Sequence, residues 1–279
     1  MKEYNFSFDL KDTEIKKKLR GETSLEVKDT FFVNDDAKFI VNGKVVGYLI
    51  KGFDKDSTTA PSLEKGDLIY SGGRRGSGIP NDKSSTFGWL PRVVIRSDFC
   101  RLTKSTLERP VVKNVLYPLA EKVSKKYQEI DSETFIKQKE IMSELSEDFF
   151  IPNTIFTSGI VNKNSRMRYH TDAGNFPGIW SCTLIYKRNV EGGNLHLPEL
   201  GLVIGFDDGD LILFDNQKYL HGVTKIIPKS KYYYRYSIVF YSLKGMLNCL
   251  PYKEEMERYN KRYSEVALDY NKKKIKSIV

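Results

Sequence analysis

The pattern of apolar and polar positions divides the chain into segments of different character. Residues 4–50 alternate apolar and polar side chains in short runs, and Asn42-Gly43 is typical of a hairpin turn, so we predict a β-rich layer there. Residues 111–149 carry apolar side chains at steps of three and four, which predicts two helices with a start signal at Asp131. The same spacing over residues 251–279 predicts an amphipathic C-terminal helix.

From residue 151 onward the period falls to two, and glycine and asparagine turns separate the apolar runs. Eight short strands with tight turns are typical of a jelly roll. We therefore predict an α+β protein with a double-stranded β-helix (jelly roll, cupin-like) core and flanking helices. The predicted strands are Ile155–Asn162, Arg166–His170, Ile179–Tyr186, Asn194–Leu197, Leu202–Phe206, Asp210–Phe214, Leu220–Ile226 and Tyr232–Tyr241.

The length of 279 residues and the hydrophobic content of 40% fit one large domain with extensions better than two domains. Residues 1–86 are predicted to be a β-rich N-terminal extension, whose glycine-rich segment 71–86 forms a mobile loop. Residues 87–245 would form the catalytic core and residues 246–279 the C-terminal helix.

Net charge and cysteine content indicate which partners and which cellular compartment to expect. The net charge of +9 favours an anionic partner such as nucleic acid, although a lysine-rich background gives the same value. The three cysteines are odd in number and far apart, which indicates neither a disulfide framework nor a zinc ribbon, and favours a reducing compartment. Without a signal sequence or an apolar run of membrane-spanning length, we expect a soluble, intracellular monomer with no membrane partner.

All three histidines of the chain fall between residues 170 and 221. His170 and Asp172 are two apart at a predicted strand end, so their side chains project to one side, and His221 on a later strand completes a triangular face. Two histidines and a carboxylate form the facial triad of non-haem Fe(II) oxygenases, whereas structural zinc normally takes four ligands. His196 is then left over, and we expect a hydrogen-bonded or exposed side chain.

Arg235 follows His221 by fourteen residues on the adjacent predicted strand. A dicarboxylate that chelates iron at one end needs a fixed cation at the other, and a guanidinium supplies two parallel charge-assisted hydrogen bonds. Ser237, on the same face, adds a hydroxyl donor. The pattern predicts 2-oxoglutarate as co-substrate, with O2. The alternative is an arginine paired to a surface carboxylate, against which the apolar neighbours Tyr234 and Tyr236 argue.

Several motifs of this chain together resemble the TET/JBP family of nucleobase-methyl dioxygenases, over roughly residues 87–243. In animal members an Asn three residues after the iron Asp and a Tyr six after the co-substrate Arg face the flipped base, and Asn175 and Tyr241 occupy these positions here. Leu243 departs from the pattern, because those members have a base-contacting His there. The resembling segments are His170–Asn175, Glu191–Leu195, Gly209–Asp215, Leu220–Val223, Arg235–Tyr241 and Phe87–Arg101.

The resemblance implies an Fe(II)- and 2-oxoglutarate-dependent dioxygenase that hydroxylates the methyl group of 5-methylcytosine in DNA, with thymine as the nearest variation. A duplex base would arrive by flipping. Its expected contacts are Asn175 and Tyr241, together with Arg92 and Arg96 of the preceding arginine-bearing segment. These two arginines could alternatively pair at a crowded sheet edge. Candidates to stack the base are Phe176, Trp180 and Tyr241, of which the first two could instead be core residues.

Two further hypotheses remain open on the sequence. One is a 2-oxoglutarate oxygenase that acts on a protein or a small molecule. The other is a catalytically silent barrel that binds nucleic acid through Arg74, Arg75 and the lysines of residues 272–276.

Overall fold

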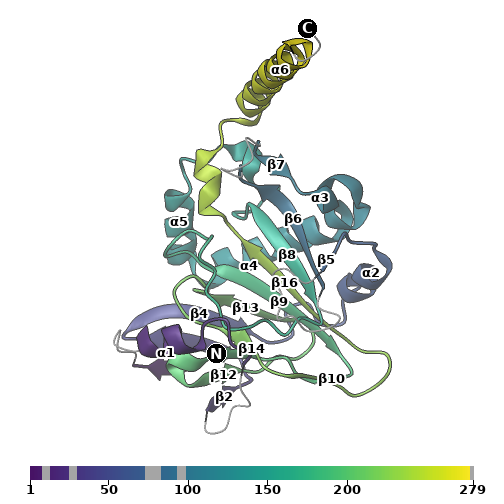
Figure 1. Ribbon diagram of the computed structural model, residues 1–279. Coiled ribbons are helices and arrows are strands. Elements are labelled where there is room, and N and C mark those ends of the chain that lie inside the picture. Colours follow the sequence, from purple (N-terminus) through teal and green to yellow (C-terminus); the bar gives the residue numbers. More distant parts are fainter. Residues whose placement is uncertain (8–12, 25–29, 73–82, 93–98, 277–279) are drawn as a thin grey trace.

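The large sheet of the computed structural model runs through the whole molecule (Figure 1). The structure describes residues 1–7, 13–24, 30–72, 83–92 and 99–276. In these residues the sheet has the order β1-β3-β4-β13-β9-β16-β8-β6-β5, and β7 pairs with β6. Its strands are β1 (Lys2–Phe6), β3 (Ala37–Val41), β4 (Lys44–Ile50), β13 (Asp210–Phe214), β9 (Ser181–Arg188), β16 (Tyr234–Tyr241), β8 (Ser158–Lys163), β6 (Lys83–Leu90), β5 (Ser71–Gly72) and β7 (Arg101–Leu102).

A smaller sheet and a separate strand pair complete the barrel. The smaller sheet has the order β14-β11-β12-β2, and β10 pairs with β15. The strands are β14 (Gly222–Val223), β11 (Leu195–Leu197), β12 (Leu202–Ile204), β2 (Phe31–Val33), β10 (Val190–Gly192) and β15 (Ile226–Pro228). The predicted jelly roll with flanking helices is confirmed. The division into 1–86, 87–245 and 246–279 stays a prediction.

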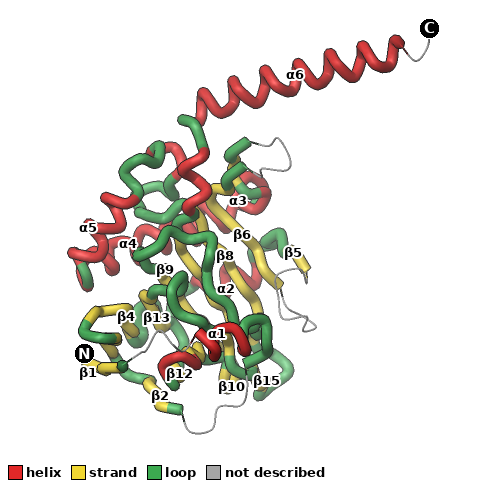
Figure 2. The backbone as a smooth tube through the Cα atoms, turned by 60° about the vertical axis from the view of Figure 1, so that its left-hand side comes forward, coloured by secondary structure: helices red, strands yellow, loops and turns green. Residues whose placement is uncertain are grey.

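The helices predicted within residues 111–149 from the spacing of apolar side chains are present in the structure. Val112–Leu116 forms a π-helical turn that leads into α4 (Tyr117–Ile130), and α5 (Ser132–Ile141) follows. The Asp131 carboxylate accepts a hydrogen bond of 2.9 Å from the Thr134 backbone N–H, which confirms the predicted helix start. The other helices are α1 (Thr13–Leu19), α2 (Thr59–Lys65), α3 (Lys104–Glu108), α5 (Ser132–Ile141) and α6 (Tyr252–Lys276), with 3-10 turns at Glu147–Phe149, Pro198–Leu200 and Lys244–Asn248. Figures 1 and 2 show α6 projecting away from the body of the molecule.

The core between the large sheet and α4 and α5 contains two of the three aromatic residues considered above for base stacking. Trp180 is 4% exposed and stacks on Tyr127, with ring centroids 5.7 Å apart, and Phe176 is 3% exposed. Both belong to the same buried cluster as Phe135 and Leu119. Phe176 and Trp180 are therefore core residues, and the hypothesis that they stack a base is wrong.

Three sequence predictions need correction at strand boundaries. Residues 166–170 form no strand. His170 makes only an isolated bridge, to His221, and the Tyr169 N–H donates to the Glu22 carbonyl in the loop after α1, at 2.9 Å. The predicted strand at 220–226 is divided between β14 and β15. The predicted loop 71–86 ends in β6, which begins at residue 83 and pairs with β5. Residues 73–82, with Arg74 and Arg75, lie outside the described residues.

The prediction that the spacing of the cysteines indicates no disulfide framework is also wrong, because one disulfide forms. Cys100 and Cys249 form a disulfide, with Cα atoms 5.9 Å apart across a sequence separation of 149, while Cys182 is free and buried. Spacing along the sequence could not reveal this pair, because the fold brings the start of α6 back to the segment before β7. Among the described helices, none has an apolar stretch long enough to cross a bilayer.

Candidate active site

Two of the predicted metal ligands are joined through their backbones. His170 and His221 form an isolated antiparallel bridge, with N–H to carbonyl distances of 2.9 and 3.0 Å in the two directions. In each imidazole Nδ1 lies near the carbonyl two residues earlier, at 2.7 Å from Arg168 O and 3.0 Å from Tyr219 O. A donor at Nδ1 leaves the lone pair on Nε2, so both Nε2 atoms are available as ligands.

Asp172 completes the group. Its Oδ1 lies 3.5 Å from His170 Nε2 and 4.0 Å from His221 Nε2, and the ligand atoms of the three residues all lie within 4.8 Å of one another. Burial, with a smaller contribution from the charge of His170, lowers the pKa of His221 to about 3, so this imidazole is neutral at physiological pH. The donor set of two imidazoles and one carboxylate fits Fe(II) with open coordination positions. The structure thus brings the three predicted ligands together.

A cavity of about 620 Å³ extends from this group between the two sheets of the barrel. Its volume lies in the range of small-molecule sites, and it is large enough for more than one small ligand. The lining residues include the triad and four of the other predicted site residues: Asn175, Arg235, Ser237 and Tyr241.

Arg235 is a buried cation in the cavity wall. It is 2% exposed, and its Nε donates to the Gly193 carbonyl at 2.7 Å. Its buried Nη1 has no hydrogen-bond partner among the residues that the structure describes. Burial lowers the pKa of Arg235 to about 10, still well above physiological pH. An unpaired guanidinium N–H in a cavity wall is well suited to bind an anion, and a carboxylate of 2-oxoglutarate has the matching geometry. The predicted alternative, a surface carboxylate partner, is wrong for the described residues.

Ser237 lies beside Arg235 on β16 and lines the same cavity. Its hydroxyl accepts a hydrogen bond of 3.4 Å from Asn162 Nδ2, and Asn162 Oδ1 accepts one of 2.9 Å from Ser84. Asn162 is thereby oriented by a neighbour on β6, and the Ser237 hydroxyl hydrogen can point to a bound carboxylate.

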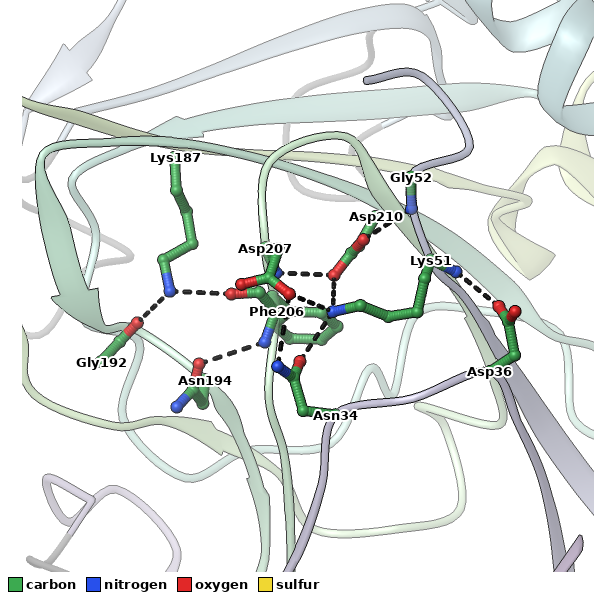
Figure 3. Close-up of polar contacts among 10 residues, drawn as sticks. All are labelled: Asn34, Asp36, Lys51, Gly52, Lys187, Gly192, Asn194, Phe206, Asp207 and Asp210. Carbon is green, nitrogen blue, oxygen red and sulfur yellow. Dashed lines mark hydrogen bonds and ion pairs between the residues drawn. The ribbon is translucent and has the colours of Figure 1, made fainter. Parts of the chain in front are cut away.

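Sequence reasoning missed Gly193, which contacts Arg235, and Lys187, which ties the adjacent Gly192 to the loop. Gly193 has φ of +65°, and a Cβ there would lie 2.6 Å from both Cδ and Nε of Arg235. Lys187, opposite Arg235 in the strand register, donates to the carbonyls of Gly192 at 2.8 Å and Phe206 at 2.9 Å (Figure 3). Burial, and then the charge of Arg235, lower the pKa of Lys187 to about 8. The Gly192-Gly193 pair was the signal available in the sequence.

Figure 3 also shows how this loop is anchored to the N-terminal extension. Asp210 accepts hydrogen bonds from the backbone N–H groups of Gly52 at 2.8 Å and Asp207 at 2.6 Å, and forms an ion pair with Lys51. The Phe206 carbonyl that receives Lys187 is therefore next to a segment tied directly to β4.

The residues predicted to face the base lie in different places in the structure. Asn175, Tyr241 and Leu243 all line the cavity that contains the triad, and Asn175 and Leu243 form a backbone bridge. Arg92 instead pairs with Glu255 at the start of α6, with Nε to Oε1 at 2.7 Å, and it is not among the cavity-lining residues. This is the pairing that the sequence left as the alternative. Arg96 lies outside the described residues.

His196 is hydrogen-bonded, which is one of the two outcomes predicted for it. It is 6% exposed on β11, and its Nδ1 lies 2.5 Å from the Tyr169 hydroxyl. Burial lowers the pKa of His196 to about 4, so the imidazole is neutral. The pair supports the backbone just before His170.

Comparisons with known proteins identify the family of the chain. Residues 95–244 match the Tet_JBP family, described as the oxygenase domain of the 2OGFeDO superfamily. The chain is 26% identical over 255 residues to the "Bifunctional helicase and thymine dioxygenase JBP2" of Trypanosoma brucei brucei, a match that covers 86% of this chain and 23% of that protein. The corresponding protein of Trypanosoma cruzi is 31% identical over 106 residues, covering 38% of this chain and 9% of that protein. The chain thus spans less than a quarter of the length of these relatives.

Among solved structures, the chain is similar to NgTET1 in complex with 5mC DNA. The TM-score is 0.58 at 14% identity, and the match covers 91% of this chain and 100% of that chain. This likeness supports the jelly-roll fold. The family match covers more than half of the chain and includes all three residues of the triad, Arg235 and Ser237. The chain therefore belongs to the TET/JBP family and is an Fe(II)- and 2-oxoglutarate-dependent dioxygenase.

Proposed function

We propose that this chain hydroxylates the 5-methyl group of a pyrimidine base in DNA, and that the preferred base is thymine. The observation that carries the proposal is one cavity that contains the triad, the unpaired Nη1 of Arg235 and the base-facing positions Asn175 and Tyr241. A methyl group that enters beside Asn175 would lie in the same enclosed space as the metal ligands. A catalytically silent barrel would not require an unpartnered cation in its core.

The residues have separate roles in this mechanism. His170, Asp172 and His221 would hold Fe(II), and Arg235 with Ser237 would hold 2-oxoglutarate. When bound, the metal and 2-oxoglutarate supply, with oxygen, the oxidising chemistry that replaces a methyl hydrogen by hydroxyl.

The protein's own contribution is placement and the exclusion of water. Arg235 fixes one carboxylate at a set distance from the metal ligands, because its own position is fixed by Gly193. Apolar lining residues, among them Ile185, Ile212 and Val223, keep water from the reacting methyl group.

Asn175 offers an acceptor to the base. Its Nδ2 donates to the Ser181 hydroxyl at 2.9 Å, so with this amide orientation Oδ1 is the atom left for a ligand. Thymine presents an N3–H donor on its pairing edge and 5-methylcytosine presents an N4 amino donor, so Asn175 accepts from either. A duplex base would reach this position only after flipping out of the stack, at a cost of a few kcal/mol.

The choice between the two bases rests on sequence. The relative that aligns over 86% of the chain is named a thymine dioxygenase, whereas the structural neighbour with 5mC DNA shares 14% identity and supports the fold alone. The sequence motifs had favoured 5-methylcytosine, and it remains the second candidate, because Leu243 at the cavity wall contributes no polar group that would select against it.

Matched oligonucleotides test the proposal. Three DNAs of one sequence, with thymine, 5-methylcytosine or unmethylated cytosine at a single position, are incubated with Fe(II), 2-oxoglutarate and enzyme, and their nucleosides are analysed by mass spectrometry. We expect 5-hydroxymethyluracil from the first DNA, and no product with His221→Ala. A dominant 5-hydroxymethylcytosine product would establish the second candidate. Succinate formation that depends on a protein or small molecule, without any base product, would refute both.

A further inference from the structure

The side chain of Asn175 is held by Ser181 on the side away from the cavity. Asn175 lines the cavity, whereas Ser181 is not among the lining residues and is 2% exposed. Asn175 Nδ2 donates to the Ser181 hydroxyl at 2.9 Å. Ser181 begins β9 and pairs with Phe214 of β13, so the sheet fixes the position of this hydroxyl. One end of the Asn175 amide is therefore attached to the sheet, and the other end is the part that a ligand can contact.

The backbone of Asn175 is fixed on both sides as well. Its N–H donates to the carbonyl of the metal ligand Asp172 at 3.0 Å. Asn175 also forms a backbone bridge with Leu243, and the neighbouring Gly174 carbonyl accepts a hydrogen bond of 3.1 Å from the Lys244 N–H. The freedom that remains to this side chain is a half-turn of the amide about its last torsion, which exchanges Oδ1 and Nδ2.

A serine hydroxyl can hold the amide in both orientations, because it is a donor as well as an acceptor. In the first orientation Nδ2 donates to Ser181 and Oδ1 is left for a ligand. After a half-turn, the Ser181 O–H would donate to Oδ1, and Nδ2 would be left for the ligand. Each orientation keeps one hydrogen bond between the two side chains. Within the described part of the chain, the Ser181 hydroxyl has no other partner that would favour one orientation.

The two candidate bases differ at the ring position next to the carbon that carries the methyl group. Thymine has the O4 acceptor at this position, and 5-methylcytosine has the N4 amino donor. A base whose methyl group points to the triad brings this position toward Asn175, because the Asn175 backbone is attached to Asp172. An outward Oδ1 matches the amino group of 5-methylcytosine, and an outward Nδ2 matches O4 of thymine.

We propose that Ser181 is a positioning residue for base recognition. It anchors the Asn175 amide in either orientation, so that the base in the cavity determines which amide atom it meets. This inference rests on the proposed function for the identity of the ligand, and it adds a contact from Nδ2 to thymine O4 to the contacts through Oδ1 described above. Because Ser181 acts through Asn175, its effect should disappear when the Asn175 amide is removed.

Binding of matched oligonucleotides without turnover tests this assignment. Full-length protein is loaded with 2-oxoglutarate and with Ni(II) in place of Fe(II), since the donor set of the triad also binds Ni(II). Labelled single-stranded DNAs carry thymine, 5-methylcytosine or an abasic site at one position and contain no other thymine. Fluorescence anisotropy gives each Kd, and the ratio of the abasic Kd to the Kd with a base measures base recognition.

We expect Ser181→Ala to lower this ratio for both bases by about 2- to 12-fold, which corresponds to the loss of one net hydrogen bond. Ser181→Thr keeps the hydroxyl and should retain the wild-type ratios. Ser105→Ala is the matched control, because it removes a buried hydroxyl of α3 that pairs with Ser85 at 2.8 Å and does not line the cavity. This control should also retain the wild-type ratios.

A double variant separates positioning from a general structural role. In the Asn175→Ala background, Ser181→Ala should cause no additional loss, whereas a purely structural role of Ser181 would lower the ratios there as well. Unchanged ratios in Ser181→Ala would overturn the proposal, as would a wild type that binds abasic DNA as tightly as the other two. A loss confined to one base would show a single amide orientation and would also overturn it.

The outcome can be told apart from failure of the proposed function. If Ser181→Ala lowers the ratios while the Fe(II)-loaded wild type yields no hydroxylated base, the assignment of Ser181 stands and the proposed reaction is wrong. If the wild type hydroxylates the base and Ser181→Ala keeps the wild-type ratios, the reaction stands and the assignment of Ser181 is wrong.

Discussion

A single methyl group at Gly193 should disable the co-substrate site without touching the metal ligands. The Cβ of Gly193→Ala would lie 2.6 Å from Cδ and Nε of Arg235, where ordinary contacts begin near 3.4 Å. Arg235 is 2% exposed and cannot move into solvent, so its guanidinium must shift by roughly 1 Å, a displacement that can cost on the order of 100-fold in rate.

The expected magnitude has two separable parts. Alanine at φ of +65° costs about 1–2 kcal/mol of stability, because its Cβ approaches the backbone in the left-handed region. Misalignment of the charge-assisted hydrogen bonds between Arg235 and a carboxylate costs about 1.5–3 kcal/mol more in binding. At 1.4 kcal/mol per tenfold, the KM for 2-oxoglutarate should rise about 10- to 150-fold.

The assay is succinate formation against 2-oxoglutarate concentration, at saturating Fe(II) and DNA, beside thermal unfolding. Gly43→Ala is the matched control, because Gly43 has φ of +76° in the hairpin turn and its added Cβ meets nothing within 4 Å. Both variants should lose similar stability, and only Gly193→Ala should raise KM. An unchanged KM in Gly193→Ala would refute the role of this loop in holding Arg235.

Three further predictions concern the rest of the site. The pKa of Lys187 in the folded protein is about 8, below its ordinary value of 10.5, so the stability of the free protein should rise with pH between these two values. The affinity for 2-oxoglutarate should fall above pH 8, because the charged form of Lys187 favours binding of the dianion. Lys187→Met should abolish both trends, as followed by thermal unfolding and KM, and their persistence would exclude Lys187 as the cause. Asp172→Ala should abolish turnover and weaken Co(II) binding, measured by absorption spectroscopy, with little change in unfolding of the metal-free protein, because His170 and His221 stay bridged. Trp180→Ala should lower the free energy of unfolding in denaturant by about 3–5 kcal/mol and leave the ratio of the rates on thymine and 5-methylcytosine unchanged. A changed ratio with unchanged stability would show that Trp180 contacts the base.

Much of the fold could be predicted from local patterns of side chains in the sequence. The strand expected at residues 210–214 is β13, and the one expected at 232–241 is β16 over Tyr234–Tyr241, because both are apolar runs buried within a sheet. Asn42-Gly43 adopts positive φ at both residues, +50° and +76°, as a two-residue hairpin requires. Asp131 marks a helix start through its own side chain. Each of these features depends on residues close in the sequence.

Features that depend on distant partners were missed. Residues 166–170 alternate like a strand, yet Tyr169 pairs with Glu22, which lies far back in the chain. Cys100 and Cys249 meet only after the fold is complete. For the site, the type and spacing of His170, Asp172 and His221 were readable, since ligand chemistry dictates them. The burial of Lys187 against the loop beside Arg235 could not be predicted, because a lysine near the end of a strand usually faces water.

The backbone bridge between His170 and His221 has a consequence for the choice of metal. Two nitrogen ligands are already placed by the folded chain, so little rearrangement is needed when an ion arrives. A ready-made site of two imidazoles and one carboxylate follows the general affinity order of divalent ions, in which Co²⁺, Ni²⁺ and Cu²⁺ bind more tightly than Fe²⁺. The fold therefore does not discriminate in favour of iron, and the ions available to the protein at the time of loading determine how much of it is active.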